Sequence, residues 1–193
     1  MIYNFNIEMK ILKRKFFERK PDIVAKQLLG KIFVRKINKK IISGEIIETE
    51  SYFGKNDPAS RAYKKKNLNF YNRMAGTPGC LLIYMVHNNW LLNIVAHKKK
   101  EVGAVLIRAV NPIDGIEIMK KNTGKKDIKH LADGPGKFTK SFGINKSFEK
   151  LDITKGKEVF IIDKKKNVKI HSSKRIGVKK DMNKNYRFYV NSQ

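Results

Sequence analysis

A chain of 193 residues is long enough to bury one hydrophobic core and short for two comfortable domains. Its 43 Lys and Arg against 17 Asp and Glu give a formal net charge of +26, while 41% of the residues are hydrophobic and 10% aromatic. This composition excludes a disordered tail and favours a folded domain that binds phosphate polyanions. Abundant Lys, Ile and Asn would also follow from AT-rich coding, so part of the charge need not serve binding.

The first half of the chain predicts a short helix followed by a β-hairpin. We expect one domain over residues 1–193, with residues 1–13 as a loosely ordered N-terminal arm. Pro21 starts and Gly30 ends the predicted helix. Two β-branched segments, 31–36 and 40–52, then predict strands joined by a polar turn. Residues 54–78, rich in Asn, Pro, Gly and Lys, predict a long functional loop.

The second half predicts further strands and two helices. Strands are expected at 80–86 and 104–110, and Pro112 is expected to start a helix that runs toward Gly124. A Gly-Pro-Gly turn at 134–136 precedes a predicted short helix ending near residue 143. Residues 158–190 predict strands separated by lysine-rich turns.

The compartment follows from what the chain lacks. A single cysteine, Cys80, cannot form an internal disulfide, and this usage fits a reducing cytoplasm. Lysines and an arginine interrupt the N-terminal apolar residues, so we expect no signal peptide. The longest apolar run, 80–86, is too short to cross a bilayer as a helix, so we expect no membrane partner.

Carboxylates are scarce, yet Glu45, Glu48 and Glu50 cluster in one predicted strand. Because strand side chains alternate, Glu48, Glu50 and Tyr52 share one face and Thr49 lies on the other. On a face that lines a cleft, such a carboxylate could take a proton from water, with its pKa set by burial. On an exposed face, the same residues are ordinary charges that balance lysines. Composition alone favours the exposed alternative.

Metal and nucleotide sites are not indicated. The four histidines are scattered, without Cys partners or the HExxH spacing of a helix-borne zinc site, so we predict no metal and no cofactor. The segment Gly-Pro-Gly-Lys at 134–137 lacks the spacing of the phosphate-binding loop found in nucleotide-binding proteins. It could still bring a helix N-terminus to a DNA phosphate.

Six short motifs occur in order along the chain: QLLGK at 27–31, IETESY at 47–52, DPAS at 57–60, NRM at 72–74, LIRA at 106–109 and GPGK at 134–137. Together they resemble the alkyladenine (3-methyladenine) DNA glycosylase family, over nearly the whole chain from about residue 16 to residue 190. The resemblance implies an α+β fold, a single mixed domain with a curved antiparallel β-sheet flanked by short helices. It also implies a metal-free, monofunctional glycosylase without lyase activity.

The resemblance assigns roles to residues of the motifs. It implies that Glu50 activates the attacking water and that Arg108 positions this water. Tyr52 and Tyr84 would sandwich the flipped base, and the bulk of Asn93 would disfavour the amino group of guanine. Flipping costs a few kcal/mol, which stacking between the two tyrosines would offset. An ionised carboxylate would serve as base and would stabilise an oxocarbenium-like state.

The chain departs from the family pattern in three ways. Arg61 stands where the family has a base-contacting His, and its guanidinium offers only donors and would repel a cationic base. The tyrosine expected to wedge into the duplex aligns with His87, so the wedge is His87, Trp90 or neither. The stretch before Asn93 is one residue shorter than in the family.

We therefore predict a base-excision repair enzyme that flips alkylated purines out of double-stranded DNA and hydrolyses their N-glycosidic bond. The predicted substrate is 3-methyladenine, with 7-methylguanine and hypoxanthine as further candidates. Arg61 is a predicted base contact, and His87, Arg73 and Lys137 are predicted DNA contacts. We expect a monomer in the cytoplasm, associated with the nucleoid.

Two alternatives stay open at this stage. The departures at Arg61 and His87 fit a non-catalytic protein that binds nucleic acid, or binds lesions without excising them. A structural chromatin-like protein is disfavoured by the Glu48 and Glu50 strand and by the Arg108 motif.

Overall fold

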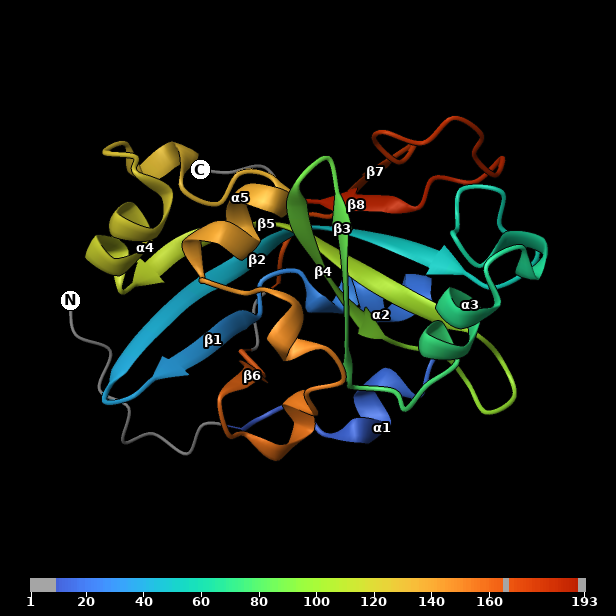
Figure 1. Ribbon diagram of the computed structural model, residues 1–193, viewed down its shortest axis with the longest axis horizontal. Coiled ribbons are helices and arrows are strands. Elements are labelled where there is room, and N and C mark those ends of the chain that lie inside the picture. Colours follow the sequence, from blue (N-terminus) through green and yellow to red (C-terminus); the bar gives the residue numbers. More distant parts are fainter. Residues whose placement is uncertain (1–9, 165–166, 191–193) are drawn as a thin grey trace.

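The long strand β2 (Lys40–Phe53) organises the fold in the computed structural model, which describes residues 10–164 and 167–190. One edge of β2 pairs with β5 (Gly103–Asp114), and these two strands cross the centre of Figure 1. The other edge is shared: β1 (Ile32–Ile37) pairs with residues 40–45, and β8 (Arg187–Tyr189) pairs with residues 48–50. The carboxylates of β2 therefore lie in the interior of the sheet.

Within residues 10–164 and 167–190 the sheet has eight strands, and every pairing is antiparallel. Its main path runs β3-β4-β5-β2-β1-β6, and β7 pairs with β8. The remaining bounds are Leu81–Val86 for β3, Asn89–Val95 for β4, Val159–Ile162 for β6 and His171–Ser173 for β7. The predicted α+β domain with an antiparallel sheet is thus confirmed, as is the predicted hairpin of β1 and β2.

Strand β4 was not predicted from the sequence. Residues 92–95 are all buried, so both faces of this part are covered and the alternation that marks a half-exposed strand is lost. His87 and Asn88 join β3 to β4 with φ values of 45° and 58°, as in the two-residue turns that suit β-hairpins. The polar His-Asn-Asn interruption between two apolar runs was the available signal for this turn.

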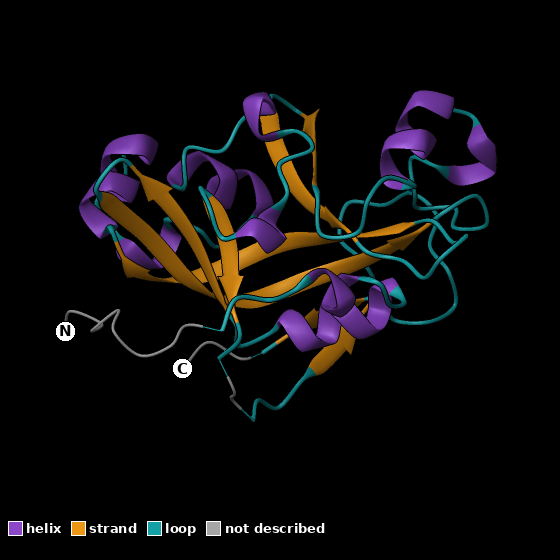
Figure 2. Cartoon of the chain, turned by 90° about the horizontal axis from the view of Figure 1, so that it is seen from below, coloured by secondary structure: helices purple, strands orange, loops and turns teal. Residues whose placement is uncertain are grey.

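Helices lie on both sides of the sheet (Figure 2). The α-helices are α1 (Arg14–Phe17), α2 (Pro21–Leu28), α3 (Leu68–Met74), α4 (Ile116–Thr123) and α5 (Pro135–Ser141). Short 3-10 helices cover Tyr63–Lys65, Ile128–His130, Lys146–Phe148 and Ile153–Lys155. None of the helices in the described part of the chain is long and apolar enough to span a membrane.

Two predicted elements need correction. Pro112 does not start a helix, because it lies in β5 beside an irregularity in the pairing with β2, where a residue without an N–H is tolerated. The helix α4 instead begins after Gly115, whose φ is 72°. The predicted loop 54–78 contains α3, which begins where the Asn67 side chain accepts a hydrogen bond from the Phe70 N–H.

The core fixes α5 and α2 against the sheet. Phe138 of α5 and Phe142, the residue that caps the C-terminus of α5, pack edge-on against Phe33 of β1, with ring centroids 5.1 and 5.4 Å from that of Phe33. On β2, the Thr49 hydroxyl donates to the Ala25 carbonyl of α2 at 3.0 Å. Of the predicted N-terminal arm, residues 10–13 include an isolated bridge of Ile11 to β6, and residues 1–9 lie outside the described part.

Candidate active site

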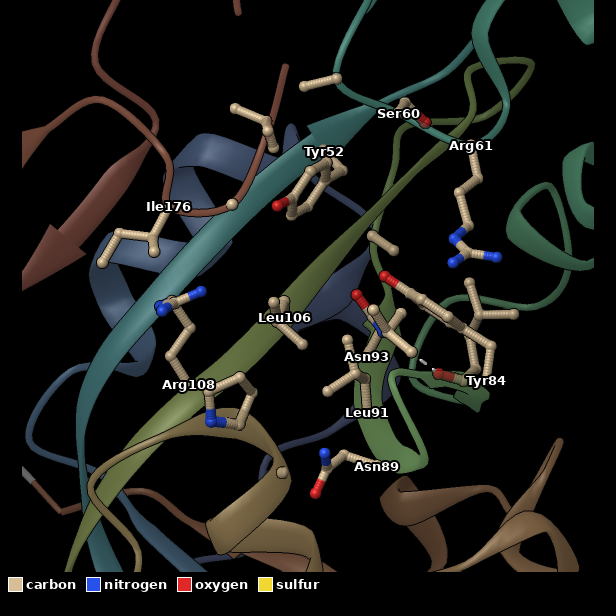
Figure 3. A pocket seen from close by; sticks show the side chains of 18 of the residues that line it. Tyr52, Ser60, Arg61, Tyr84, Asn89, Leu91, Asn93, Leu106, Arg108 and Ile176 are labelled. Carbon is tan, nitrogen blue, oxygen red and sulfur yellow. Dashed lines mark hydrogen bonds between the residues drawn. The ribbon is translucent and has the colours of Figure 1, made fainter. Parts of the chain in front are cut away.

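A cleft of about 640 Å³ lies between the β3–β4 hairpin, the β2–β5 pair, the N-terminal end of α5 and the segment 176–178. Tyr52 and Arg108 line it from β2 and β5, and Tyr84 lines it from β3, as Figure 3 shows. The volume is typical of small-molecule sites, which commonly measure roughly 300–1,000 Å³. The cleft is therefore large enough to receive a flipped purine.

The cleft exists because the hairpin leaves the sheet. Strand β4 pairs with β5 only over Asn93–Val95, so the outer part of the hairpin stands away from β5. Helix α5 supports it there, since the Thr139 hydroxyl donates to the Trp90 carbonyl at 2.6 Å. A Cβ on Gly136 would lie 2.7 Å from the Cβ of Asn89, so this approach requires glycine. The hairpin tip is thereby held over the cleft.

Glu50 lies fully buried at the base of the cleft, with 0% of its side chain exposed. Its Oε2 accepts a hydrogen bond from the Tyr52 hydroxyl at 2.6 Å, and its Oε1 accepts one from the Ile176 N–H at 2.8 Å. The Arg108 Nη1 lies 3.1 Å from the same Oε1. Burial raises the pKa of the Glu50 carboxyl, and Arg108, the Ile176 N–H and the Tyr52 hydroxyl oppose this rise.

A pair of β-bulges directs Arg108 toward the carboxylates. Strand β2 pairs Glu48 with Ala109 and Thr49 with Ile107, so Arg108 is an extra residue between two ladder pairs. Bulges of this kind re-aim a side chain. The Arg108 Nε donates to the Glu48 Oε1 at 2.6 Å, and the Arg187 Nε donates to the same oxygen at 2.6 Å. Glu48 therefore holds the guanidinium that reaches Glu50.

Sequence reasoning did not identify Arg175, which holds the segment 174–182 against β2. Its guanidinium contacts Asp57 through two bonds of 2.7 and 2.8 Å, and Nη1 also donates to the Ser51 carbonyl at 2.9 Å. Asp181 accepts from its Nε at 3.0 Å. Its Cζ lies 4.7 Å from the centroid of the Tyr52 ring. In the sequence nothing separates Arg175 from the other lysines and arginines. Its role becomes visible only through its contacts with Asp57 and Ser51, which are far away in the chain.

Arg61 and Tyr84 meet on the opposite side of the cleft (Figure 3). The Arg61 Cζ lies 4.8 Å from the centroid of the Tyr84 ring, a cation–π geometry. Burial raises the pKa of the Tyr84 hydroxyl, and the Arg61 charge opposes this rise. Tyr84 also packs edge-on against Phe70 of α3, with ring centroids 5.2 Å apart.

The structure brings most of the predicted site residues together. Glu50 lies beneath the cleft, and the predicted residues that line it are Tyr52, Arg61, Tyr84, His87, Asn93, Arg108 and Lys137. His87 is exposed at the hairpin tip. In the described residues, no three His, Cys, Asp or Glu side chains gather in a way that could hold a metal ion.

Two residues predicted to contact DNA, Arg73 and the possible wedge Trp90, lie outside the cleft. The Arg73 Nε donates to the Glu149 carboxylate at 2.8 Å and its Nη2 donates to the Ile83 carbonyl at 2.6 Å, so this guanidinium ties α3 to β3. Its predicted contact with DNA stays a prediction. Trp90 pairs with Met85 in the hairpin and is not among the residues that line the cleft.

Comparison with known proteins places the chain among the DNA glycosylases, which are hydrolases. The family described as "Methylpurine-DNA glycosylase (MPG)" matches residues 15–193. The chain belongs to this family.

Three related proteins align with this chain over most of their own length. A protein of Clostridium perfringens (strain 13 / Type A) is 36% identical over 179 residues, which are 86% of this chain and 87% of the relative. One from Chlorobium phaeobacteroides (strain BS1) is 39% identical, covering 94% and 92%. One from Borrelia garinii subsp. bavariensis is 37% identical, covering 93% and 95%. Each of the three is named "Putative 3-methyladenine DNA glycosylase".

Proposed function

We propose that the protein hydrolyses the N-glycosidic bond of alkylated purines in double-stranded DNA, with 3-methyladenine as its first substrate. The observation that carries this proposal is the buried Glu50 carboxylate, held between Arg108 and Tyr52 at the base of a cleft of purine size. The family and the names of the relatives support the same reaction.

In the proposed reaction, the damaged nucleotide rotates out of the duplex and its base enters the cleft between Tyr52 and Tyr84. A carboxylate oxygen has two lone pairs, and Oε2 of Glu50 accepts one bond, from Tyr52. The second lone pair remains for a water next to Arg108. Oxygen of this water bonds to C1′ of the sugar while the bond from C1′ to the purine nitrogen breaks. The proton passes to Glu50, and the electron pair leaves with the base.

The cleft favours water as the nucleophile over an amine of the protein. Among the described residues that line it, Lys137 supplies the side-chain amine, and this ammonium is paired with Asp133 at 2.8 Å. A lyase reaction needs a free amine to form a Schiff base with the sugar. We therefore propose a monofunctional glycosylase.

The DNA contacts, the oligomeric state and the compartment are also part of the proposal. We propose that His87, exposed at the hairpin tip, and Lys137, which lines the cleft, contact the duplex, with Arg73 as a further candidate. A monomer is proposed because the residues proposed for the site all come from a single chain. The high net positive charge suits work on nucleoid DNA in the cytoplasm.

The test is a duplex with a single 3-methyladenine, or a single hypoxanthine, incubated with protein and then treated with alkali to cleave at abasic sites. Glu50→Gln should lower the single-turnover rate by roughly 10²–10⁴-fold, as loss of a general base does, while the Kd for the duplex stays unchanged. The matched control is Glu117→Gln, a change at an exposed carboxylate of α4.

The two negative outcomes have different meanings. No abasic product from wild-type protein, with tight binding to the damaged duplex, would establish a lesion-binding protein without catalysis. Full activity of Glu50→Gln would show that another group activates the water.

A further inference from the structure

Strand β3 lies at one end of the sheet, so within residues 10–164 and 167–190 only β4 pairs with it. On its outer edge, the backbone polar groups of alternate residues need partners from elsewhere in the chain. At Leu81 these partners are backbone groups: its N–H donates to the Leu151 carbonyl, and its carbonyl accepts from the Lys150 N–H, both at 2.9 Å. By the alternation of an antiparallel strand, Ile83 is the next residue whose backbone groups face outward.

At Ile83, two charged side chains supply the bonds that a neighbouring strand would make. The Ile83 N–H donates to Oε2 of Glu149 at 2.6 Å, and Nη2 of Arg73 donates to the Ile83 carbonyl at 2.6 Å. The Arg73 Nε also donates to Oε1 of Glu149 at 2.8 Å. These three bonds form a closed ring through the ion pair and the Ile83 backbone. Because hydrogen bonds with a charged partner are stronger than neutral ones, the ring fixes β3 at Ile83.

Tyr84 is the next residue of β3, and its ring lines the cleft (Figure 3). Phe70 of α3 packs edge-on against this ring, with ring centroids 5.2 Å apart. The Arg73 guanidinium, about one turn further along α3, has its Cζ 5.7 Å from the centroid of the Phe70 ring. The ion pair is therefore linked to Tyr84 in two ways, through the Ile83 backbone and through Phe70.

We infer that Glu149, together with Arg73, is a positioning residue for Tyr84 and sets the fraction of damaged nucleotides that stay flipped into the cleft. This inference rests on the proposed function, in which the flipped base lies between Tyr52 and Tyr84. Neither charged side chain lines the cleft, and both line a separate cavity beside β3. Glu149 therefore acts through the strand and not by contact with the base. Nη1 of Arg73 takes part in none of the three bonds, so the proposed contact of Arg73 with DNA is compatible with this role.

Base flipping makes the position of the Tyr84 ring important. The free energy lost on unstacking the damaged base from the duplex is offset by new stacking on aromatic rings in the cleft. Stacking weakens when one of the rings is displaced or free to move. Without the carboxylate, the Ile83 N–H and the Arg73 Nε lose their shared partner, and the edge of β3 next to Tyr84 is released. The flipped fraction should then fall, whereas Glu50, on β2, keeps its own contacts.

The test measures flipping by the fluorescence of 2-aminopurine placed next to the damaged base in the duplexes of the excision assay, since this fluorophore brightens when its stacked neighbour leaves. All variants also carry Glu50→Gln, so that the base is not excised during the measurement. Glu149→Gln replaces one acceptor oxygen by an NH₂ donor and opens the ring of bonds. It should lower the flipped fraction at saturating protein about tenfold, as partial loss of one stacking contact would. The Kd for undamaged duplex should not change.

A double-variant comparison separates positioning of Tyr84 from general destabilisation. In a Tyr84→Ala background, Glu149→Gln should cause no further loss of flipping, because its effect passes through the Tyr84 ring. Losses that add would overturn the inference. Glu149→Asp keeps both acceptor oxygens on a shorter side chain and should flip the base more than Glu149→Gln does. Thermal melting checks folding, and if Glu149→Gln is unfolded at the assay temperature, Glu149→Asp replaces it in the same comparison.

Glu158→Gln is the matched control, because this carboxylate also lies near an arginine, 3.8 Å from Arg35, and does not line the cleft. Its flipped fraction should equal that of the Glu50→Gln parent. A parental flipped fraction in Glu149→Gln, or no flipping by the parent itself, would overturn the inference. Excision by wild type is assayed separately, so its absence would overturn the glycosylase proposal while the flipping measurements still test Glu149.

Discussion

Arg175 and Asp57 form a bidentate ion pair whose two side chains are both completely buried, with N···O distances of 2.7 and 2.8 Å. The pair joins residues 118 positions apart in the chain. Because it holds the segment 174–182 against β2, it also presents the Ile176 N–H to Glu50 at 2.8 Å. Arg175 is therefore a positioning residue for the proposed base, and it makes no contact with the space that the substrate would occupy.

Removal of Arg175 should destabilise the fold strongly. Arg175→Met leaves the buried Asp57 carboxylate unpaired, and such a change typically costs about 3–5 kcal/mol of unfolding free energy. Urea denaturation measures this loss. The double variant Arg175→Met with Asp57→Asn should recover part of it, because the fully buried carboxylate is removed and only Asp181, whose side chain is 14% exposed, still loses its partner. A loss below about 1 kcal/mol would show that water reaches Asp57.

The excision rate should fall on the acid side at a pH above the ordinary 4.5 of a glutamate. Glu50 must be ionised to act as base, and its burial raises the pKa of its carboxyl, so protonation begins at a higher pH as the pH is lowered. A single-turnover rate profile measures this limb. A midpoint at or below 4.5 would show that Glu50 is solvated in the working complex.

The same profile tests the positioning role of Arg175. The hydrogen bond from the Ile176 N–H lowers the pKa of the Glu50 carboxyl. Arg175→Lys should loosen the segment 174–182 and weaken this bond, so the pKa of Glu50 should rise. The acid limb should then move to still higher pH, with a reduced plateau rate and a nearly unchanged Kd for DNA. A purely structural role would lower the melting temperature without moving the limb. Arg19→Lys, at a guanidinium that bonds Gln27 and the Phe16 carbonyl, is the control.

The support of the hairpin by α5 can be tested at Gly136. Gly136→Ala places a Cβ 2.7 Å from Asn89, so the hairpin tip must shift and DNA affinity should fall several-fold. Adding Asn89→Gly removes the atoms in contact and should restore affinity. Thermal melting of Gly136→Ala, compared with wild type, shows whether the variant is folded. Equal Kd values for wild type and Gly136→Ala would count against this support.

Phosphate contacts should appear in the salt dependence of binding. The logarithm of the association constant should fall linearly with the logarithm of salt concentration, with a slope of about −0.9 per phosphate neutralised. Lys137→Gln should reduce the magnitude of this slope by about one contact. Lys155→Gln, in the 3-10 helix beside β6, should leave it unchanged. A flat response of the wild-type protein would remove the electrostatic basis for DNA binding.

The local parts of the fold were predictable because they depend on neighbouring residues. Alternation in β2 placed Glu48, Glu50 and Tyr52 on one face. The contacts of Arg108 with both glutamates, and of Tyr52 with Glu50, agree with that prediction. Strand β4 and helix α3 escaped prediction. Strand β4 is buried on both faces, so its sequence does not alternate between apolar and polar residues. Helix α3 is short and lies inside a polar segment, so its sequence gives no clear helical pattern.

The sequence by itself determined the class of fold, the hairpin of β1 and β2, the ordered motifs and the strand that carries Glu50. Only the tertiary structure decided that Glu50 is buried, that a pair of bulges turns Arg108 toward it, and that Arg175 and Asp57 close the site from distant parts of the chain. The physical reason is the distance along the chain over which each interaction acts. Strand periodicity and turn chemistry act between residues a few positions apart, whereas burial and the pairing of charges depend on which segments the completed sheet brings together.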